Sequence, residues 1–82
     1  MVRKELVAFG AAVRHYRSQL ALSQEALAER SDLHRTYVSG IERGERNVGL
    51  VNVYRLATAL KTSPAELFAT AEEFRRGGRR GR

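Results

Sequence analysis

The sequence contains no cysteine among its 82 residues. This absence excludes disulfides, thiolate metal sites and cysteine nucleophiles. No second ligand-type side chain stands at metal-ligand spacing from either histidine, His15 or His34, so no metal site is expected. No apolar run approaches the roughly 20 residues that cross a membrane, and the start of the chain lacks a cleavable apolar stretch. We therefore expect a cytoplasmic protein that has no metal, no cofactor and no contact with a membrane.

Catalytic constellations are also missing. The sequence has no paired histidine and acid at a useful spacing and no glycine-rich phosphate loop. Its one pair of adjacent carboxylates, Glu72 and Glu73, precedes arginines near the end of a predicted helix. A chain of 82 residues builds one modest core and leaves too little bulk for an enclosed substrate pocket. We predict that the protein is not an enzyme and takes no small-molecule ligand.

The positive charge is concentrated at the C-terminal end. The formal net charge is +6, but five of the 15 basic residues lie in the last eight positions. The other positions carry ten basic residues against nine acidic ones. Residues 75–82 contain only arginine and glycine, so they are predicted to be a disordered tail that follows a domain at 1–74. Three interpretations of this tail stay open: an arm that follows phosphates, an inert solubilising sequence, or an addition from cloning.

Apolar residues at steps of three and four predict helices throughout the domain. Leu6, Phe9 and Val13, for example, begin one apolar stripe. The helices are expected near 3–20, 24–30, 35–43 and 50–60, and from 64 onward. No alternating strand pattern occurs and the connections are short, which favours an all-α fold, a compact five-helix orthogonal bundle.

Residues that favour helix ends support these boundaries. Ser23 is the expected N-cap of the second helix, and Ser63 is the expected N-cap of the fifth. Asp32 tolerates the left-handed conformation better than most residues, and it lies just after the second helix. Gly44 is expected to adopt that conformation where the third helix ends.

The second and third helices, with four residues between them, predict a helix-turn-helix. In such a motif one helix crosses the DNA backbone while the other lies in the major groove. Val38 and Ile41 are expected to face inward, which leaves a polar outer face. We predict that this face contacts bases through Arg35, Thr36 and Ser39, since an arginine can donate two hydrogen bonds to guanine. An ordinary solvated face is the alternative.

A further polar set is expected to meet DNA phosphates. It comprises Gln24, Tyr37, Arg43, Arg46 and Asn47. Tyr37 has two equal interpretations, a phosphate contact or packing against the first helix. Gln24 has the alternative of simple helix-start chemistry, and the two arginines have the alternative of solvated surface charges.

These motif residues resemble one family. The segments SQEALA at 23–28 and RTYVSGIERGERN at 35–47 look like the XRE family, the phage repressor and Cro type of helix-turn-helix, over roughly residues 6–70. The resemblance implies a lambda-repressor-like fold and a homodimer bound to an inverted repeat in double-stranded DNA. It also implies a structural ion pair between Arg17 and Glu42. The second segment is in addition similar to controller proteins of restriction–modification systems.

Some positions depart from the family pattern. Gly40 stands where some relatives have a base-reading side chain, so specificity is expected to depend on the start of the third helix. Asp32 replaces a usual turn glycine, and Val48-Gly49 replaces a usual Pro-Ser before the fourth helix. Lys61 stands where a glycine often ends the fourth helix. These departures bear on local geometry and leave the predicted fold unchanged.

The fifth predicted helix carries more apolar side chains than a small domain needs. They are Leu67, Phe68, Ala71 and Phe74, and some of them are predicted to form a dimer interface, with an intramolecular core as the alternative. We expect a sequence-specific transcription regulator that represses by occluding RNA polymerase or activates by touching it. One alternative is an antitoxin-like protein that binds a partner protein and autoregulates its operon. Another is nucleic-acid coating through the tail.

Overall fold

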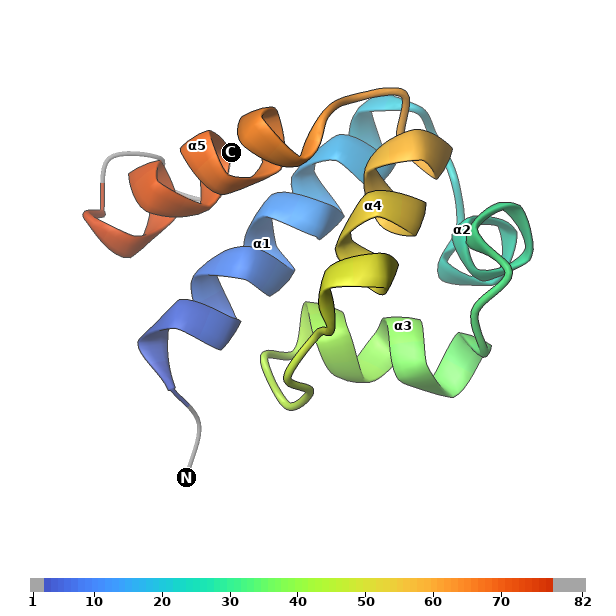
Figure 1. Cartoon of the computed structure of the whole chain (residues 1–82), viewed down its shortest axis with the longest axis horizontal. Coiled ribbons are helices and arrows are strands. Elements are labelled where there is room, and N and C mark those ends of the chain that lie inside the picture. Colours follow the sequence, from blue (N-terminus) through green and yellow to red (C-terminus); the bar gives the residue numbers. More distant parts are fainter. Residues whose placement is uncertain (1–2, 78–82) are drawn as a thin grey trace.

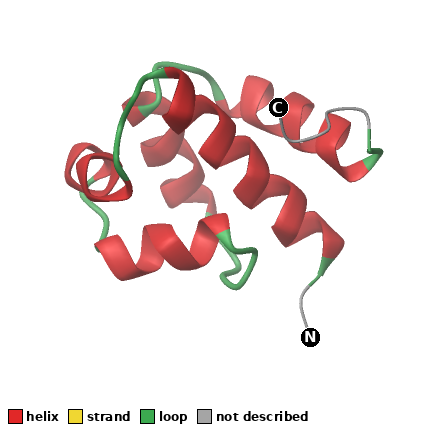
Figure 2. Cartoon of the chain, turned by 180° about the vertical axis from the view of Figure 1, so that it is seen from behind, coloured by secondary structure: helices red, strands yellow, loops and turns green. Residues whose placement is uncertain are grey.

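The computed structural model describes residues 3–77 and folds them into five helices (Figure 1). The helices are α1 Lys4–Gln19, α2 Gln24–Ser31, α3 Arg35–Glu42, α4 Leu50–Ala59 and α5 Pro64–Arg75. The described part of the chain contains no strand (Figure 2). The predicted all-α fold and all five predicted helices are confirmed, and the helix boundaries differ from the predicted ones by at most one residue.

α1 runs diagonally through the bundle and packs against α5 and α3 (Figure 1). α2 packs against α3 and α4, so the two helices of the helix-turn-helix are supported from the inside by both α1 and α4. The largest fully buried side chains come from all five helices and from Leu60, the residue directly after α4. They are Val13, Leu27, Val38, Ile41, Leu56, Leu60 and Leu67. Each such side chain stabilises the fold by about 1.5–3 kcal/mol through the apolar area it removes from water.

α1 and α3 cross in backbone contact at Gly10. A Cβ atom at this position would lie 2.2 Å from the carbonyl oxygen of Ile41 and 2.9 Å from that of Glu42. Both distances are shorter than any real carbon–oxygen contact, so a side chain here would push the helices apart. The absence of a side chain at Gly10 therefore sets how closely α3 approaches the rest of the bundle.

The first four helices end in the same hydrogen-bonded motif. In each, a residue with positive φ follows the helix: Ala21 (56°), Asp32 (58°), Gly44 (77°) and Lys61 (58°). The next N–H then bonds back to a carbonyl five residues earlier, as Leu33 does to Ala28 at 2.9 Å. The left-handed conformations expected at Asp32 and Gly44 are confirmed. Of these four positions, Gly44 leaves no room for a side chain, because a Cβ there would lie 2.8 Å from the Cα of Val7.

α5 begins as predicted and extends one residue into the predicted tail. The Ser63 hydroxyl accepts from the backbone N–H of Glu66 at 3.0 Å, which confirms the cap. Arg75 belongs to the helix, and its guanidinium donates to the Glu72 carboxylate at 2.8 and 3.1 Å. Arg76 and Gly77 follow α5, whereas positions 78–82 of the predicted tail lie outside the described residues.

Candidate nucleic-acid interface

The turn between α2 and α3 has three residues, one fewer than predicted. It consists of 32–34, because Ser31 belongs to α2. The buried Ser31 hydroxyl donates to the carbonyl oxygen of Leu27 at 2.7 Å, so it is satisfied inside the helix. Leu33 packs from the turn against the hydrophobic core. The angle between α2 and α3 is thus fixed by contacts on their inner side.

The first turn of α3 is exposed and is capped by a histidine. His34 Nδ1 accepts a hydrogen bond from the backbone N–H of Thr36 at 3.2 Å. The side chains of Arg35 and Thr36 both lie at this end and are exposed. The sequence interpretation considered His34 only as a metal ligand and missed the cap. The missed signal was its position immediately before a predicted helix.

α3 is divided into a buried face and a polar face, as predicted. Val38 and Ile41 are at most 1% exposed. Thr36 and Ser39, three residues apart, lie on the outer face. The Ser39 hydroxyl accepts from Nη1 of Arg43, one turn later. Ser39 is therefore already bonded within α3, whereas no side-chain hydrogen bond of Arg35 or Thr36 occurs within residues 3–77.

A buried carboxylate connects α3 to α1 and α2. Glu42, with 3% of its side chain exposed, accepts from Arg17 Nε at 2.6 Å and from Arg17 Nη2 at 2.9 Å. The third guanidinium nitrogen of Arg17 donates to the carbonyl oxygen of Leu22 at 2.7 Å. The hydrogen bond with Glu42 raises the pKa of Arg17, so the guanidinium stays charged. The structure contains the ion pair that the family resemblance implied.

Gln24 is part of the same network. Its Nε2 donates to Glu42 Oε1 at 3.0 Å, a bond that the sequence interpretation did not include. An amide nitrogen has two hydrogens, so one N–H of Gln24 remains for a ligand. The ion pair thereby orients the first side chain of α2, which is predicted to meet a phosphate.

Tyr37 lies at the edge of the core with its hydroxyl toward α4. The ring is half-buried and packs against the buried cluster. Its Oη accepts from Asn52 Nδ2 at 3.3 Å. The structure thus gives Tyr37 a packing role, with a polar partner on α4 rather than on the first helix. The predicted phosphate contact is compatible with this position and stays a prediction.

The three remaining predicted phosphate residues follow α3. Arg43 forms an ion pair with Glu45 at 3.1 Å, and both side chains are about half exposed. Such an exposed pair contributes little to stability, so a phosphate can replace the carboxylate. The stem of Arg46 covers Gly40, where a Cβ would lie 2.8 Å from Arg46 Cγ. Asn47 is exposed beside it.

Two other kinds of site are absent from residues 3–77. No group of three or more histidine, cysteine, aspartate or glutamate side chains is arranged to hold a metal ion. No helix in this part of the chain has the length and apolar character needed to cross a membrane.

Comparison with known proteins identifies the motif. The family model described as helix-turn-helix matches residues 13–67, which include all of α2, α3 and α4. The chain belongs to the XRE-type helix-turn-helix family. Members of this family are DNA-binding transcription regulators. The resemblance stated from the sequence is thereby confirmed.

The XRE-type chain is similar to restriction–modification controllers. It is 52% identical over 60 residues to control protein C.BamHI of Bacillus amyloliquefaciens, covering 72% of this chain and 74% of the relative. The solved controller C.AhdI of Aeromonas hydrophila has a TM-score of 0.79 and 55% identity, covering 80% of this chain and all of that one. A C.Esp1396I tetramer bound to its natural 35-base-pair operator has a TM-score of 0.80 and 29% identity, covering 88% and 95%.

The apolar side chains of α5 divide between core and surface in this XRE-type domain. Leu67 is fully buried and Ala71 is 7% exposed, so both belong to the core of their own chain. The predicted dimer interface needs correction at Leu67, which has no surface left for a second copy, whereas the small exposed part of Ala71 lines a hollow at the surface. Phe74 is half-buried, with its ring centroid 6.2 Å from that of His15. Phe68 remains 49% exposed.

α4 exposes further large apolar side chains that the sequence interpretation did not single out as surface. Leu50 is 70% exposed, and Val51 and Tyr54 are 66% and 57% exposed. We call Leu50, Val51, Tyr54 and Phe68 the α4–α5 apolar surface. The signal in the sequence was a second apolar stripe on α4, at 51 and 54, beside the stripe that is buried.

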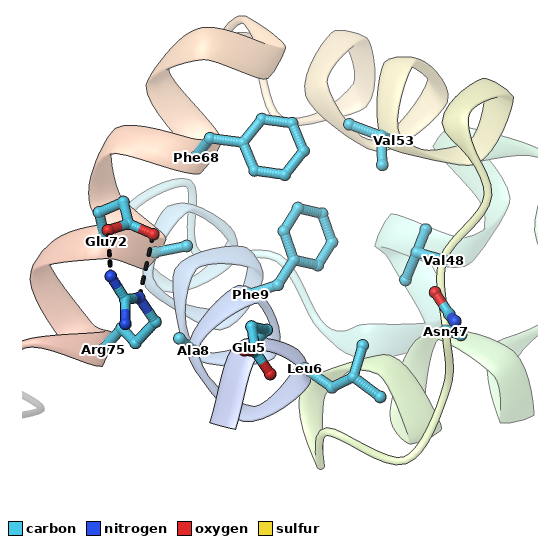
Figure 3. Close-up of a pocket in the computed structure, with 11 residues that line it drawn as sticks. Glu5, Leu6, Ala8, Phe9, Asn47, Val48, Val53, Phe68, Glu72 and Arg75 are labelled. Atoms are coloured by element: carbon cyan, nitrogen blue, oxygen red, sulfur yellow. Dashed lines mark hydrogen bonds and ion pairs between the residues drawn. The ribbon is translucent and has the colours of Figure 1, made fainter. Parts of the chain in front are cut away.

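An open hollow of about 300 Å³ lies next to Phe68 (Figure 3). The rings of Phe68 and Phe9 point toward each other, with centroids 5.6 Å apart, and Val48 and Val53 form the opposite wall. The ion pair of Glu72 and Arg75 lies at its rim. The hollow is mostly apolar and extends from α5 to the start of α4.

Proposed function

We propose that this protein is a sequence-specific transcription regulator that binds an operator as a homodimer, with α3 in the major groove. One observation carries the proposal. The Arg17–Glu42–Gln24 network fixes α3 to the scaffold, while the side chains of Arg35 and Thr36 stay exposed and unbonded. A recognition helix needs this combination, because rigid positioning converts side-chain chemistry into base discrimination.

Base readout is assigned to the start of α3. Arg35 can donate two hydrogen bonds to guanine O6 and N7, which is worth about 1–3 kcal/mol of discrimination against other bases. Thr36 can contact a base through its hydroxyl or pack its methyl group on a thymine methyl. Ser39 is included with a smaller role, because Arg43 already bonds its hydroxyl.

Phosphate contacts are assigned to side chains around α3. Gln24 retains one N–H at the start of α2, beside the backbone N–H groups that the Ser23 cap on Ala26 leaves free, and these favour an anion. Tyr37, Arg43, Arg46 and Asn47 complete the set on the other sides of the helix. These contacts would supply affinity and register, while the base contacts supply sequence preference.

A homodimer is supported by the α4–α5 apolar surface. Exposed apolar patches of this kind mark interaction sites, and two copies related by a twofold axis would cover the same patch on each other. The hollow beside Phe68 offers space for side chains of the second copy. A twofold dimer presents two α3 helices to successive major grooves and therefore matches an inverted repeat.

The relatives suggest which genes are regulated. Proteins named as restriction–modification controllers match most of the chain at more than half identity. We therefore assign the regulated operon to a restriction–modification system. The similar C.Esp1396I protein binds its operator as a tetramer, which is consistent with two dimers on adjacent sites.

Selection of binding sites from a random duplex library tests the proposal. At physiological salt the wild-type protein should enrich an inverted repeat whose half-sites are about 10 base pairs apart, centre to centre. Arg35→Ala should lose the preference at one position of each half-site. Arg76→Ala, an equal loss of charge at the end of α5, should retain it. Absence of enrichment, with binding that vanishes steeply as salt rises, would leave only backbone contacts and refute the proposal.

A further inference from the structure

The hydroxyl of Tyr37 is held by a residue outside the helix-turn-helix. Asn52, in the first turn of α4, donates from Nδ2 to Tyr37 Oη at 3.3 Å, and both side chains are half-buried. α3 and α4 are not among the helix pairs that pack closely through their backbones. Packing of the ring against the core places Oη, and the bond from Asn52 sets the direction of its O–H.

The direction of this hydrogen bond decides what Tyr37 can offer a ligand. A phenol has one proton and can also accept, whereas an amide NH2 group can only donate. Because Oη accepts from Asn52, its own proton is directed away from Asn52. A phosphate oxygen can only accept, so the phenol is left in the state that binds it. The incoming N–H also strengthens the outgoing O–H as a donor, because chained hydrogen bonds polarise one another.

We propose that Asn52 is a positioning residue for operator binding: it sets the Tyr37 hydroxyl as a donor toward a DNA phosphate. This inference rests on the proposed function and deepens it, since it makes a residue of α4 part of the phosphate contact. Asn52 belongs to the same helix as Leu50, Val51 and Tyr54 of the α4–α5 apolar surface. The helix proposed to hold the dimer together therefore also sets a DNA contact of the recognition helix.

A double-mutant cycle on operator affinity tests whether Asn52 acts through Tyr37. Tyr37→Phe should weaken binding about tenfold, the usual effect of losing one hydrogen bond to a charged group. Asn52→Ala should weaken binding severalfold. The double variant should bind no worse than Tyr37→Phe alone, because Asn52 has no role once the hydroxyl is gone. Losses that multiply would mean that the two residues act separately, and the proposal would be wrong.

A second variant reverses the hydrogen bond. The carboxylate of Asn52→Asp accepts the Tyr37 proton and turns it away from DNA, so binding should fall further than in Asn52→Ala. The added negative charge also repels DNA, and this part persists in a Tyr37→Phe background. We expect Asn52→Asp to cost more in the wild type than in that background. Equal costs would overturn the proposal.

Two controls complete the experiment. Thermal unfolding of each variant shows whether the fold is retained, and we expect the five variants to melt within a few degrees of the wild type. A wild type that enriches no operator would refute the proposed function itself. An operator that the wild type and Tyr37→Phe bind equally would refute this inference alone.

Discussion

At the scale of single residues, Glu42 is the most constrained charge in the described chain. Its carboxylate is nearly buried and accepts from Arg17 twice and from Gln24 once. Arg17→Ala would leave this charge buried without its ion-pair partner, which typically costs about 3–5 kcal/mol. We expect a loss of that order in the free energy of unfolding, measured by denaturant titration.

The comparison variants separate this effect from general charge loss. Arg30→Ala removes an exposed arginine from α2 and should change stability by less than about 0.5 kcal/mol. Replacing both partners, as in Arg17→Met with Glu42→Leu, should be less destabilising than Arg17→Ala, because no charge is left buried. A double variant as unstable as the single one would contradict this explanation.

Contacts between side chains were predictable only where a family pattern supplied them. The family resemblance implied the pair of Arg17 and Glu42, and the structure contains it. The bonds from Gln24 to Glu42 and from Asn52 to Tyr37 join different helices, so they depend on how the helices pack. Helical periodicity indicates which side of a helix is buried but does not specify which residue lies opposite.

At the scale of elements, the crossing of α1 and α3 depends on Gly10. Alanine is favoured over glycine inside a helix by about 1 kcal/mol. At this position, however, the added Cβ would lie 2.2 Å from the Ile41 carbonyl oxygen, and the backbone must move. We expect Gly10→Ala to destabilise the protein by about 1–3 kcal/mol, the usual effect of overpacking. Chemical denaturation measures this loss.

If α3 is displaced, Gly10→Ala should also weaken operator binding. The loss of affinity should be larger than the loss of folded protein accounts for. Gly49→Ser serves as the control, because a Cβ at Gly49 meets nothing within 4 Å and serine is a good N-cap. Unchanged stability and affinity in Gly10→Ala would mean that α1 and α3 can separate without consequence.

The ends of the elements were predictable where a residue carries a backbone preference. Ser63, Asp32 and Gly44 indicated their conformations in advance, since their side chains or lack of one favour caps and left-handed turns. Ala21 adopts the same left-handed conformation with φ of 56°, although alanine has no such preference. There the hydrogen bonds of the closing turn impose the conformation, and no sequence signal precedes it.

At the scale of the whole molecule, the sequence indicated that α5 has an apolar side but not what covers it. Leu67 and Ala71 are buried because α1 lies along α5 within the same chain. The exposure of Leu50 at the start of α4 became apparent only from the folded arrangement. Assigning a surface to a second copy requires knowing which faces the chain has already covered.

The dimer proposal makes its prediction at this scale. Leu50 is 70% exposed, so Leu50→Glu should leave the monomer fold and its melting temperature nearly unchanged. In a twofold interface the substitution acts twice, bringing a charge from each copy into an apolar contact. Sedimentation equilibrium should then detect monomers at concentrations where the wild type is dimeric. Affinity for a duplex with two half-sites should fall, while affinity for a single half-site should not.

The affinity for a single half-site distinguishes loss of the dimer from damage to α3, because one recognition helix is enough to bind a single half-site. Gln19→Glu adds the same charge at an exposed polar position at the end of α1 and should leave the dimer intact. A Leu50→Glu protein that remains dimeric would exclude the start of α4 from the interface. The two copies would then have to pair through another face to place the second α3 on its half-site. Phe68 and the hollow beside it would be the part of the α4–α5 apolar surface left to examine, and Phe68→Glu would then be the variant that decides.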